Sequence, residues 1–189
     1  MRVGKGDQFV YYNSDKEIDV PLQFGDGEYT ITYYKRISGN QYQMIDEYSI
    51  NAEDTSDYML YPNCYVPEVT PAWDYARLLC RDKNEMSAYQ TIIKWSKHKL
   101  VYDYIKAYTV AKFGVMPDPQ DCWEKKRGIC QDIASLIVGM LRAGGVHARL
   151  VIGKANGRNH AWVEAVINGK VYRHDPCAST AKYVKERWY

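Results

Sequence analysis

The stretch Lys126-Arg-Gly-Ile-Cys130-Gln-Asp-Ile-Ala-Ser-Leu136 joins a glycine-containing turn to the start of an amphipathic helix. Apolar residues then repeat at three- and four-residue spacing, which predicts one buried helix face: Ile133, Leu136, Ile137, Met140 and Leu141. Gly144-Gly145 follows the last of them and is typical of a helix C-terminus. We therefore predict a helix over residues 130–142 that carries Cys130 in its first turn.

The segments after this helix read as strands. Residues 148–152, 161–167 and 170–173 are rich in apolar and β-branched side chains. Asn168-Gly169 separates the last two and is a strong signal for a tight hairpin. Upstream, Thr70-Pro71 has the pattern of a helix start, and further helical patterns cover residues 86–99 and the segment from Asp103 to the stop at Met116-Pro-Asp-Pro119. Helices followed by an antiparallel sheet indicate an α+β fold.

The first third of the chain is different in character. Four strands are expected, near residues 8–12, 17–23, 28–37 and 41–50, with glycine turns between them. A connector with three prolines then precedes the helical part. We predict three parts: an N-terminal β unit over residues 1–57, a Pro-rich connector over 58–71, and an α+β domain over 72–189.

Composition places the 189-residue chain among ordinary globular proteins, with 46% hydrophobic and 25% charged residues. The first 60 residues hold five Lys and Arg against eleven Asp and Glu, and the remainder holds twenty against twelve. Basic residues are scattered, so no nucleic-acid partner is predicted. No apolar run reaches membrane-spanning length, and no signal peptide is visible at the start. The eight tyrosines of the first 60 residues could pack in strands or bind a glycan or protein.

Five cysteines occur, without a CxxC pair or zinc-finger spacing, so a structural metal site is not expected. An odd number fits one nucleophile with up to two disulfides, and also fits five reduced thiols. At a helix start, unpaired backbone N–H groups and the helix dipole would stabilise the thiolate of Cys130. Lys126 and Arg127 add positive charge. A structural cysteine would sit more naturally on the apolar stripe further along the helix.

A nucleophilic cysteine needs an imidazole partner and an orienting carboxylate. Of the four histidines, His98 and His147 are expected to face solvent, and His174 to point away from its neighbour Asp175. His160 remains, at the start of a strand. Folding the hairpin about Asn168-Gly169 brings Asp175 opposite residues 161–163, beside His160 and within reach of its Nδ1.

Several short motifs recur in the order of a known family: Leu100-Val-Tyr-Asp103, Gly128-Ile-Cys130-Gln-Asp-Ile-Ala-Ser-Leu136, Met140-Leu-Arg-Ala-Gly-Gly-Val146, His160-Ala-Trp-Val-Glu164 and Asp175-Pro176. Together they resemble the transglutaminase-like core of bacteria, which is related to papain-like peptidases. The resemblance covers about residues 85–180. It implies a papain- or transglutaminase-like fold, with the nucleophile helix packed on an antiparallel sheet and the N-terminal β unit as an extension found in some surface-exposed members.

The resemblance also implies roles: Cys130 as nucleophile, His160 as general base and acid, and Asp175 as orienting carboxylate. The backbone N–H of Cys130 would be one oxyanion donor, and Tyr102 is our candidate for the second. Cys122 and Cys177 depart from the family pattern. Because both flank the site, we expect them to lie close together, with a disulfide as one outcome.

The implied reaction is acyl chemistry on a peptide or protein amide, with hydrolysis favoured over transfer to an amine and without a metal or organic cofactor. An extracytoplasmic location and a cell-wall-associated substrate are further expectations. The alternative is a non-catalytic binding or scaffold module on the same fold, and the intact cysteine, histidine and aspartate argue against it.

Overall fold

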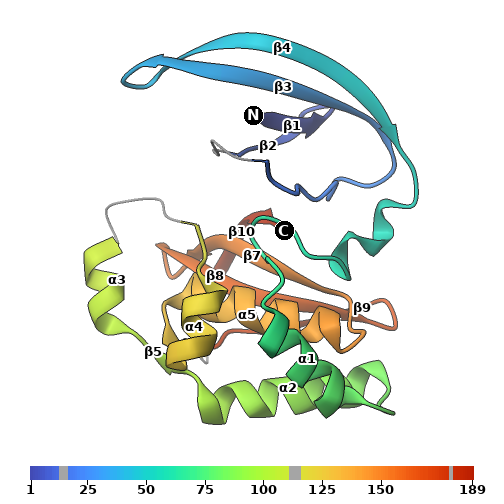
Figure 1. The fold of residues 1–189 in the computed structure, drawn as a ribbon, viewed down its shortest axis with the longest axis vertical. Coiled ribbons are helices and arrows are strands. Elements are labelled where there is room, and N and C mark those ends of the chain that lie inside the picture. The colour runs from blue at the N-terminus through green and yellow to red at the C-terminus, as the bar shows by residue number, and fades with distance from the viewer. Residues whose placement is uncertain (13–16, 111–115, 179–180) are drawn as a thin grey trace. The chain divides into compact units, whose positions relative to one another are not determined.

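The computed structural model describes residues 1–12, 17–110, 116–178 and 181–189. The chain forms two compact units, Met1–Tyr58 and Met59–Tyr189, which are described separately (Figure 1). Among the described residues, no helix is both long enough and apolar enough to cross a membrane.

The first unit is an antiparallel sheet in the order β2-β1-β3-β4. Its strands are β1 (Arg2–Lys5), β2 (Gln8–Tyr11), β3 (Gly27–Ser38) and β4 (Gln41–Ala52), followed by the 3-10 helix η1 (Thr55–Met59). The strand expected at 17–23 was wrong, because this segment has no strand in the structure and contains Pro21, which cannot donate to a ladder. Instead, β1 pairs with both β2 and β3.

The helices of the second unit are α1 (Thr70–Cys80), α2 (Glu85–Lys99), α3 (Tyr104–Val110), α4 (Pro119–Lys125) and α5 (Cys130–Ala143). The three upstream helices expected from the sequence are present, although residues 111–115 of the third lie outside the described residues. Sequence reasoning missed α4. Its start has a helix signal all the same, because the Asp118 carboxylate accepts from the backbone N–H of Asp121 and Pro119 occupies the first turn.

The sheet of the second unit has the antiparallel order β10-β7-β8-β9. Its strands are β7 (Ala148–Ala155), β8 (Arg158–Ile167), β9 (Lys170–His174) and β10 (Tyr183–Trp188). Asn168 and Gly169 both have positive φ angles, 50° and 73°, so the predicted hairpin between β8 and β9 is confirmed. The edge strand β10 was not anticipated. It pairs with β7, far away in sequence.

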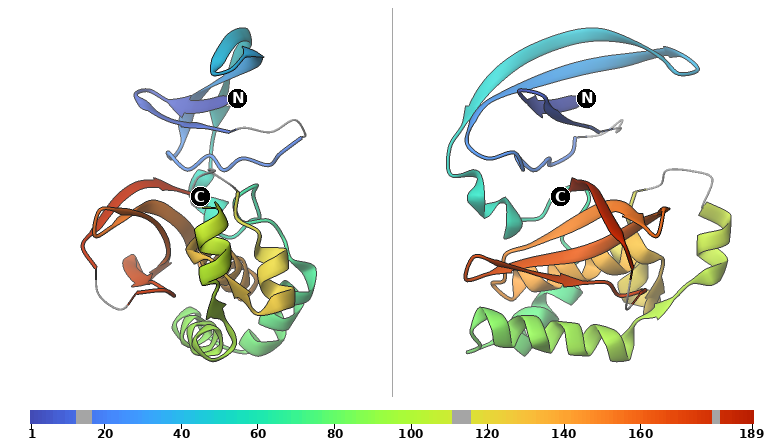
Figure 2. Two further views of the ribbon diagram at one scale, coloured as in Figure 1. Left: turned by 90° about the vertical axis from the view of Figure 1, so that its left-hand side faces the viewer. Right: turned by 180° about the vertical axis from the view of Figure 1, so that it is seen from behind.

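Helix α5 is the centre of the second unit (Figures 1 and 2). It packs against β7 and β8, and also against α1, α2 and α4. All its residues from Asp132 to Arg142 are buried, not only one stripe. Because both the sheet and other helices pack against α5, the helix is a rigid support for Cys130 at its N-terminal end. The α+β prediction is confirmed: the cysteine-bearing helix packs on an antiparallel sheet, and an N-terminal β unit precedes this core in the chain.

Candidate active site

Cys130 is the first residue of α5 and is partly exposed. The turn before it is held by a short parallel pair, β5 (Val101–Tyr102) with β6 (Arg127–Gly128). A side chain at Gly128 would have its Cβ 2.9 Å from the Asp132 Cβ and 3.1 Å from the Cys122 Sγ, so this close approach requires glycine. The turn therefore fixes the backbone conformation that leads into Cys130 and α5.

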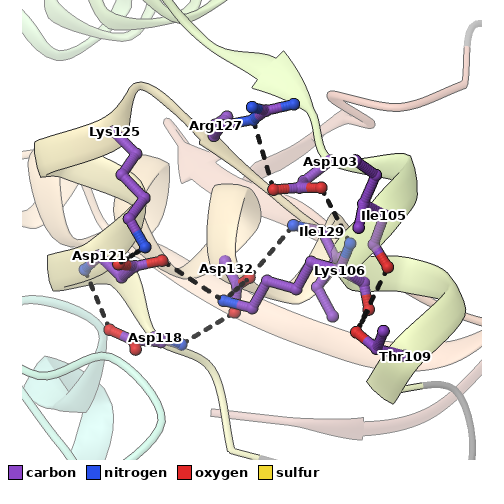
Figure 3. A network of polar contacts seen from close by, with 10 residues as sticks. All are labelled: Asp103, Ile105, Lys106, Thr109, Asp118, Asp121, Lys125, Arg127, Ile129 and Asp132. Atoms are coloured by element: carbon purple, nitrogen blue, oxygen red, sulfur yellow. Dashed lines mark hydrogen bonds and ion pairs between the residues drawn. The ribbon is translucent and has the colours of Figure 1, made fainter.

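The buried carboxylate of Asp132 organises the same turn (Figure 3). Its Oδ2 accepts from the backbone N–H of Ile129 at 3.1 Å, and its Oδ1 from that of Asp118 at 2.9 Å. The Lys106 ammonium lies 2.7 Å from Oδ2. Burial lowers the pKa of Lys106, but the bond and charge of Asp132 outweigh it and leave that pKa raised. One carboxylate thus ties α3, the start of α4 and the start of α5 together.

His160 stands near the start of β8, and its Nε2 lies 2.7 Å from Oδ2 of Asp175. The pairing with Asp175 was expected, but through Nδ1; the structure uses Nε2. The side chain of Cys130 is also close enough to influence the pKa of His160. Burial lowers the pKa of His160, yet the hydrogen bonds and charges of Asp175 and Cys130 prevail and raise it to about 9. This environment favours an imidazolium at neutral pH.

Both oxygens of the Asp175 carboxylate have partners. Its Oδ1 accepts from the backbone N–H groups of Cys177 and Ala178 at 2.8 and 3.0 Å. Its Oδ2 accepts from His160 and from the hydroxyl of Tyr183, the latter at 2.8 Å. Burial raises the pKa of Asp175, but these hydrogen bonds lower it by more. The carboxylate is therefore kept ionised beside the imidazole.

Tyr102 lies in β5 opposite Gly128, next to the turn that leads into Cys130. Its ring meets that of Tyr104 edge-on at 4.9 Å between centroids. Burial is the largest cause that raises the pKa of Tyr102, to about 12, and the nearby Cys130 is the next. The hydroxyl therefore keeps its proton at neutral pH. The oxyanion role of Tyr102 stays a prediction.

Cys122 and Cys177 are not bridged in the structure, and a disulfide between them stays a prediction. Burial is the main cause that raises the pKa of both thiols, to about 12 for Cys122. Each of these two thiols therefore stays protonated at neutral pH, unlike a thiolate nucleophile.

The remaining histidines lie elsewhere. His98 is exposed, as expected. His147, also expected in solvent, is only partly exposed, because its Nδ1 lies 3.2 Å from the Glu85 carboxylate. His174 is buried, and burial lowers its pKa to about 4. His160 is thus the histidine that the fold brings to Cys130.

Sequence reasoning missed two residues that contact the site, Asp132 and Tyr183. Asp132 stood within the quoted motif, three positions after the residue that precedes the helix, where a carboxylate commonly caps backbone N–H groups. Tyr183 carried no local signal. Among the described residues, no group of three or more His, Cys, Asp and Glu side chains is arranged to hold a metal ion.

The chain is similar to known proteins in sequence and in structure. The family model described as the transglutaminase-like superfamily matches residues 74–176. An uncharacterized protein of Mycobacterium leprae (strain TN) is 30% identical over 135 residues, which are 65% of this chain and 46% of that protein. This chain therefore spans about half the length of that curated relative.

Among solved structures, a candidate cysteine protease from Cytophaga hutchinsonii has a TM-score of 0.54 at 16% identity, over 88% of this chain and 68% of that one. The periplasmic domain of TgpA from Pseudomonas aeruginosa has a TM-score of 0.48 at 19% identity, over 63% of this chain and 45% of that one. At such identities the structural likeness concerns the fold alone.

Proposed function

This chain belongs to the transglutaminase-like superfamily, and from that premise we propose that it performs cysteine-based acyl chemistry on peptide or protein amides. The observation that carries the proposal is His160, which is hydrogen-bonded to Asp175 and lies close enough to Cys130 for that side chain to raise its pKa. Such an arrangement activates a thiol and supplies a proton for the leaving group. We assign Cys130 as nucleophile, His160 as general acid and base, and Asp175 as the residue that orients His160.

In the first half-reaction, the Cys130 sulfur attacks the carbonyl carbon of an amide, and a tetrahedral oxyanion forms. The backbone N–H of Cys130 and the hydroxyl of Tyr102 are the proposed oxyanion donors. The C–N bond then breaks, the nitrogen takes a proton from the His160 imidazolium, and the amine leaves. An acyl thioester on Cys130 remains. The raised pKa of His160 supports this step, because the imidazole holds its proton at neutral pH.

In the second half-reaction, His160 removes a proton from an acceptor that attacks the thioester, and the thiol is released. Water as acceptor gives a carboxylic acid, and a lysine amine gives an isopeptide bond. We favour hydrolysis over transfer to an amine, because Cys130 is partly exposed and solvent water can reach the thioester without a second protein.

The first experiment tests the nucleophile. The protein is treated with iodoacetamide at pH 6, where an ordinary thiol of pKa about 8.5 is mostly protonated, and the labelled cysteines are mapped. We expect Cys130 to react much faster than Cys64, which is also partly exposed and serves as internal control. H160A should remove this difference. Labelling of Cys130 no faster than Cys64 in the unmodified protein would contradict the proposal.

The second experiment tests the reaction. Ammonia release from glutamine-containing peptides is measured with and without an added primary amine, beside the C130A variant as blank. Hydrolysis releases ammonia and forms glutamate without the amine, whereas transfer needs the amine and incorporates it. Equal release by C130A and the unmodified protein would count against the assignment of Cys130.

A further inference from the structure

Tyr183, the first residue of β10, contacts the same carboxylate oxygen as His160. Its hydroxyl donates to Oδ2 of Asp175 at 2.8 Å, and Nε2 of His160 lies 2.7 Å from that oxygen. Tyr183 lies beyond residues 74–176, the part of the chain that matches the family. A residue outside the matched core thus reaches into the centre of the site.

The phenol is itself held firmly. Its ring centroid lies 5.0 Å from that of the fully buried Trp162, and the Arg173 guanidinium lies 4.5 Å from it on the ring face. Its backbone pairs with Ala155 in the β10–β7 ladder. Burial and the hydrogen bond with Asp175 raise the pKa of Tyr183 to about 12. The hydroxyl therefore stays a donor throughout the neutral range.

We propose that Tyr183 is a positioning residue, which holds the Asp175 carboxylate toward His160; the inference rests on the proposed function. The other oxygen, Oδ1, takes its two donors from the backbone of the loop at residues 177–178. The partners of Oδ2 both come from the sheet, since His160 lies in β8 and Tyr183 in β10. The Tyr183 hydroxyl therefore holds Oδ2 in place relative to β8. With both oxygens fixed, the carboxylate cannot turn away from the imidazole.

The experiment compares Cys130 alkylation by iodoacetamide at pH 6 in the unmodified protein, Y183F, D175A and Y183F/D175A. Y172F is the matched control, because it removes one tyrosine hydroxyl from β9 of the same sheet. We expect Y183F to slow alkylation about tenfold, the scale of one hydrogen bond to a charged group. Y172F should have no effect. In the D175A background, adding Y183F should change the rate less than twofold, because the hydroxyl has lost its partner.

A second readout is the pKa of His160, followed by NMR of histidine-labelled protein. It should fall in Y183F, because a less firmly held carboxylate stabilises the imidazolium less, and stay unchanged in Y172F. An unchanged alkylation rate in Y183F, an undiminished tenfold loss in the D175A background, or a rise in the pKa of His160 would overturn the role of Tyr183. The undiminished loss would indicate packing damage, which persists without Asp175.

The unmodified protein separates the two proposals. Rapid labelling of its Cys130 combined with any of these contrary results rejects Tyr183 as a positioning residue and leaves the proposed function standing. Slow labelling in the unmodified protein rejects both.

Discussion

At the scale of single residues, two histidines of the second unit have opposite environments. His174 and Asp175 follow each other at the end of β9, yet only Asp175 contacts His160. Burial lowers the pKa of His174 to about 4, whereas the partners of His160 raise its pKa to about 9. Among the described residues, Nε2 of His174 is buried without a hydrogen-bond partner. His174 can therefore serve as an internal reference when the pKa of His160 is measured.

We predict that the two histidines titrate at opposite ends of the pH range. Between pH 6 and 8, His160 should be protonated and His174 neutral, in NMR spectra of histidine-labelled protein. D175N should lower the pKa of His160, because the carboxylate that stabilises the imidazolium is lost. Ammonia release should decline as pH rises through about 9, since His160 then lacks the proton for the leaving amine. A His160 that titrates at an unshifted pKa near 6.5 would contradict the prediction.

Local sequence patterns brought forward Cys130, His160 and Asp175 as candidates, and the resemblance to a known family joined them into one set. Cys130 follows a glycine turn at a helix start, and the Asn168-Gly169 hairpin sets the register that brings Asp175 beside β8. Local patterns did not predict which ring nitrogen of His160 bonds Asp175, because that depends on the rotation of the side chain. They also did not predict the contact of Tyr183 with Asp175, because it depends on a strand pairing without a local sequence signal. The catalytic roles themselves stay predictions.

At the scale of elements, the start of α5 depends on a charge that sequence reasoning overlooked. Asp132 has no exposed surface, and its partners Lys106 and the backbone of Asp118 lie 26 and 14 positions upstream. Such contacts appear only once α3 and α4 are placed. The apolar spacing of α5, in contrast, predicted its limits within one residue, 130–142 against Cys130–Ala143.

We predict that D132A lowers the free energy of unfolding by at least about 2 kcal/mol, because two backbone N–H groups lose a buried acceptor. It should also slow Cys130 alkylation, since the turn before Cys130 is no longer held. Urea unfolding and iodoacetamide labelling measure the two effects. D121N is the control: Asp121 also faces Lys106, at 4.0 Å, but is partly exposed, so its loss should cost less than about 1 kcal/mol. Equal destabilisation by both variants would refute this role of Asp132.

The crossing of α5 and α1 gives a prediction that runs against helix propensity. Alanine stabilises a helix interior relative to glycine by about 1 kcal/mol. A Cβ at Gly139 would, however, lie 2.8 Å from Nε1 of the buried Trp73. We therefore expect G139A to destabilise the protein by about 1–3 kcal/mol, the usual cost of overpacking. Thermal unfolding measures it, and W73F should reduce the effect by removing Nε1. A G139A protein more stable than the unmodified one would show that Trp73 moves aside freely.

At the scale of the whole molecule, the order β10-β7-β8-β9 places the last strand beside the first strand of the sheet. Consecutive hairpins predict β7, β8 and β9 in a row, but the return of β10 to β7 is a long-range pairing without a local pattern. The same holds for β1, which inserts between β2 and β3 in the first unit. Short-range signals therefore predicted the α+β class but not the strand order of either sheet.

Within the second unit, the segment before α1 is tied to α5 and to the C-terminal residue by long-range contacts. The Ser135 hydroxyl donates to the carbonyl oxygen of Tyr65 at 2.7 Å, and the buried Arg142 donates to that of Tyr61 at 2.6 Å. The ring of Tyr65 stacks on that of Tyr189 at 3.7 Å between centroids. Residues that read in the sequence as a connector thus supply acceptors to α5.

These contacts predict how the chain can be divided. A fragment of residues 59–189 keeps every acceptor of Ser135 and Arg142 named above, together with Cys130, His160, Asp175 and Tyr183. We expect it to fold by itself and to label at Cys130 as fast as the whole chain. A fragment of residues 72–189 loses the carbonyls of Tyr61 and Tyr65, and should be less stable by about 2 kcal/mol or more, since buried donors are left unpaired.

Urea unfolding and iodoacetamide labelling of both fragments, beside the whole chain, measure the difference. Equal stability of the two fragments would mean that residues 59–71 act only as a tether. A folded 59–189 fragment whose Cys130 has lost its rapid labelling would mean that the site needs residues 1–58. The first result would contradict the anchoring of α5 by this segment, and the second would contradict the independence of the unit.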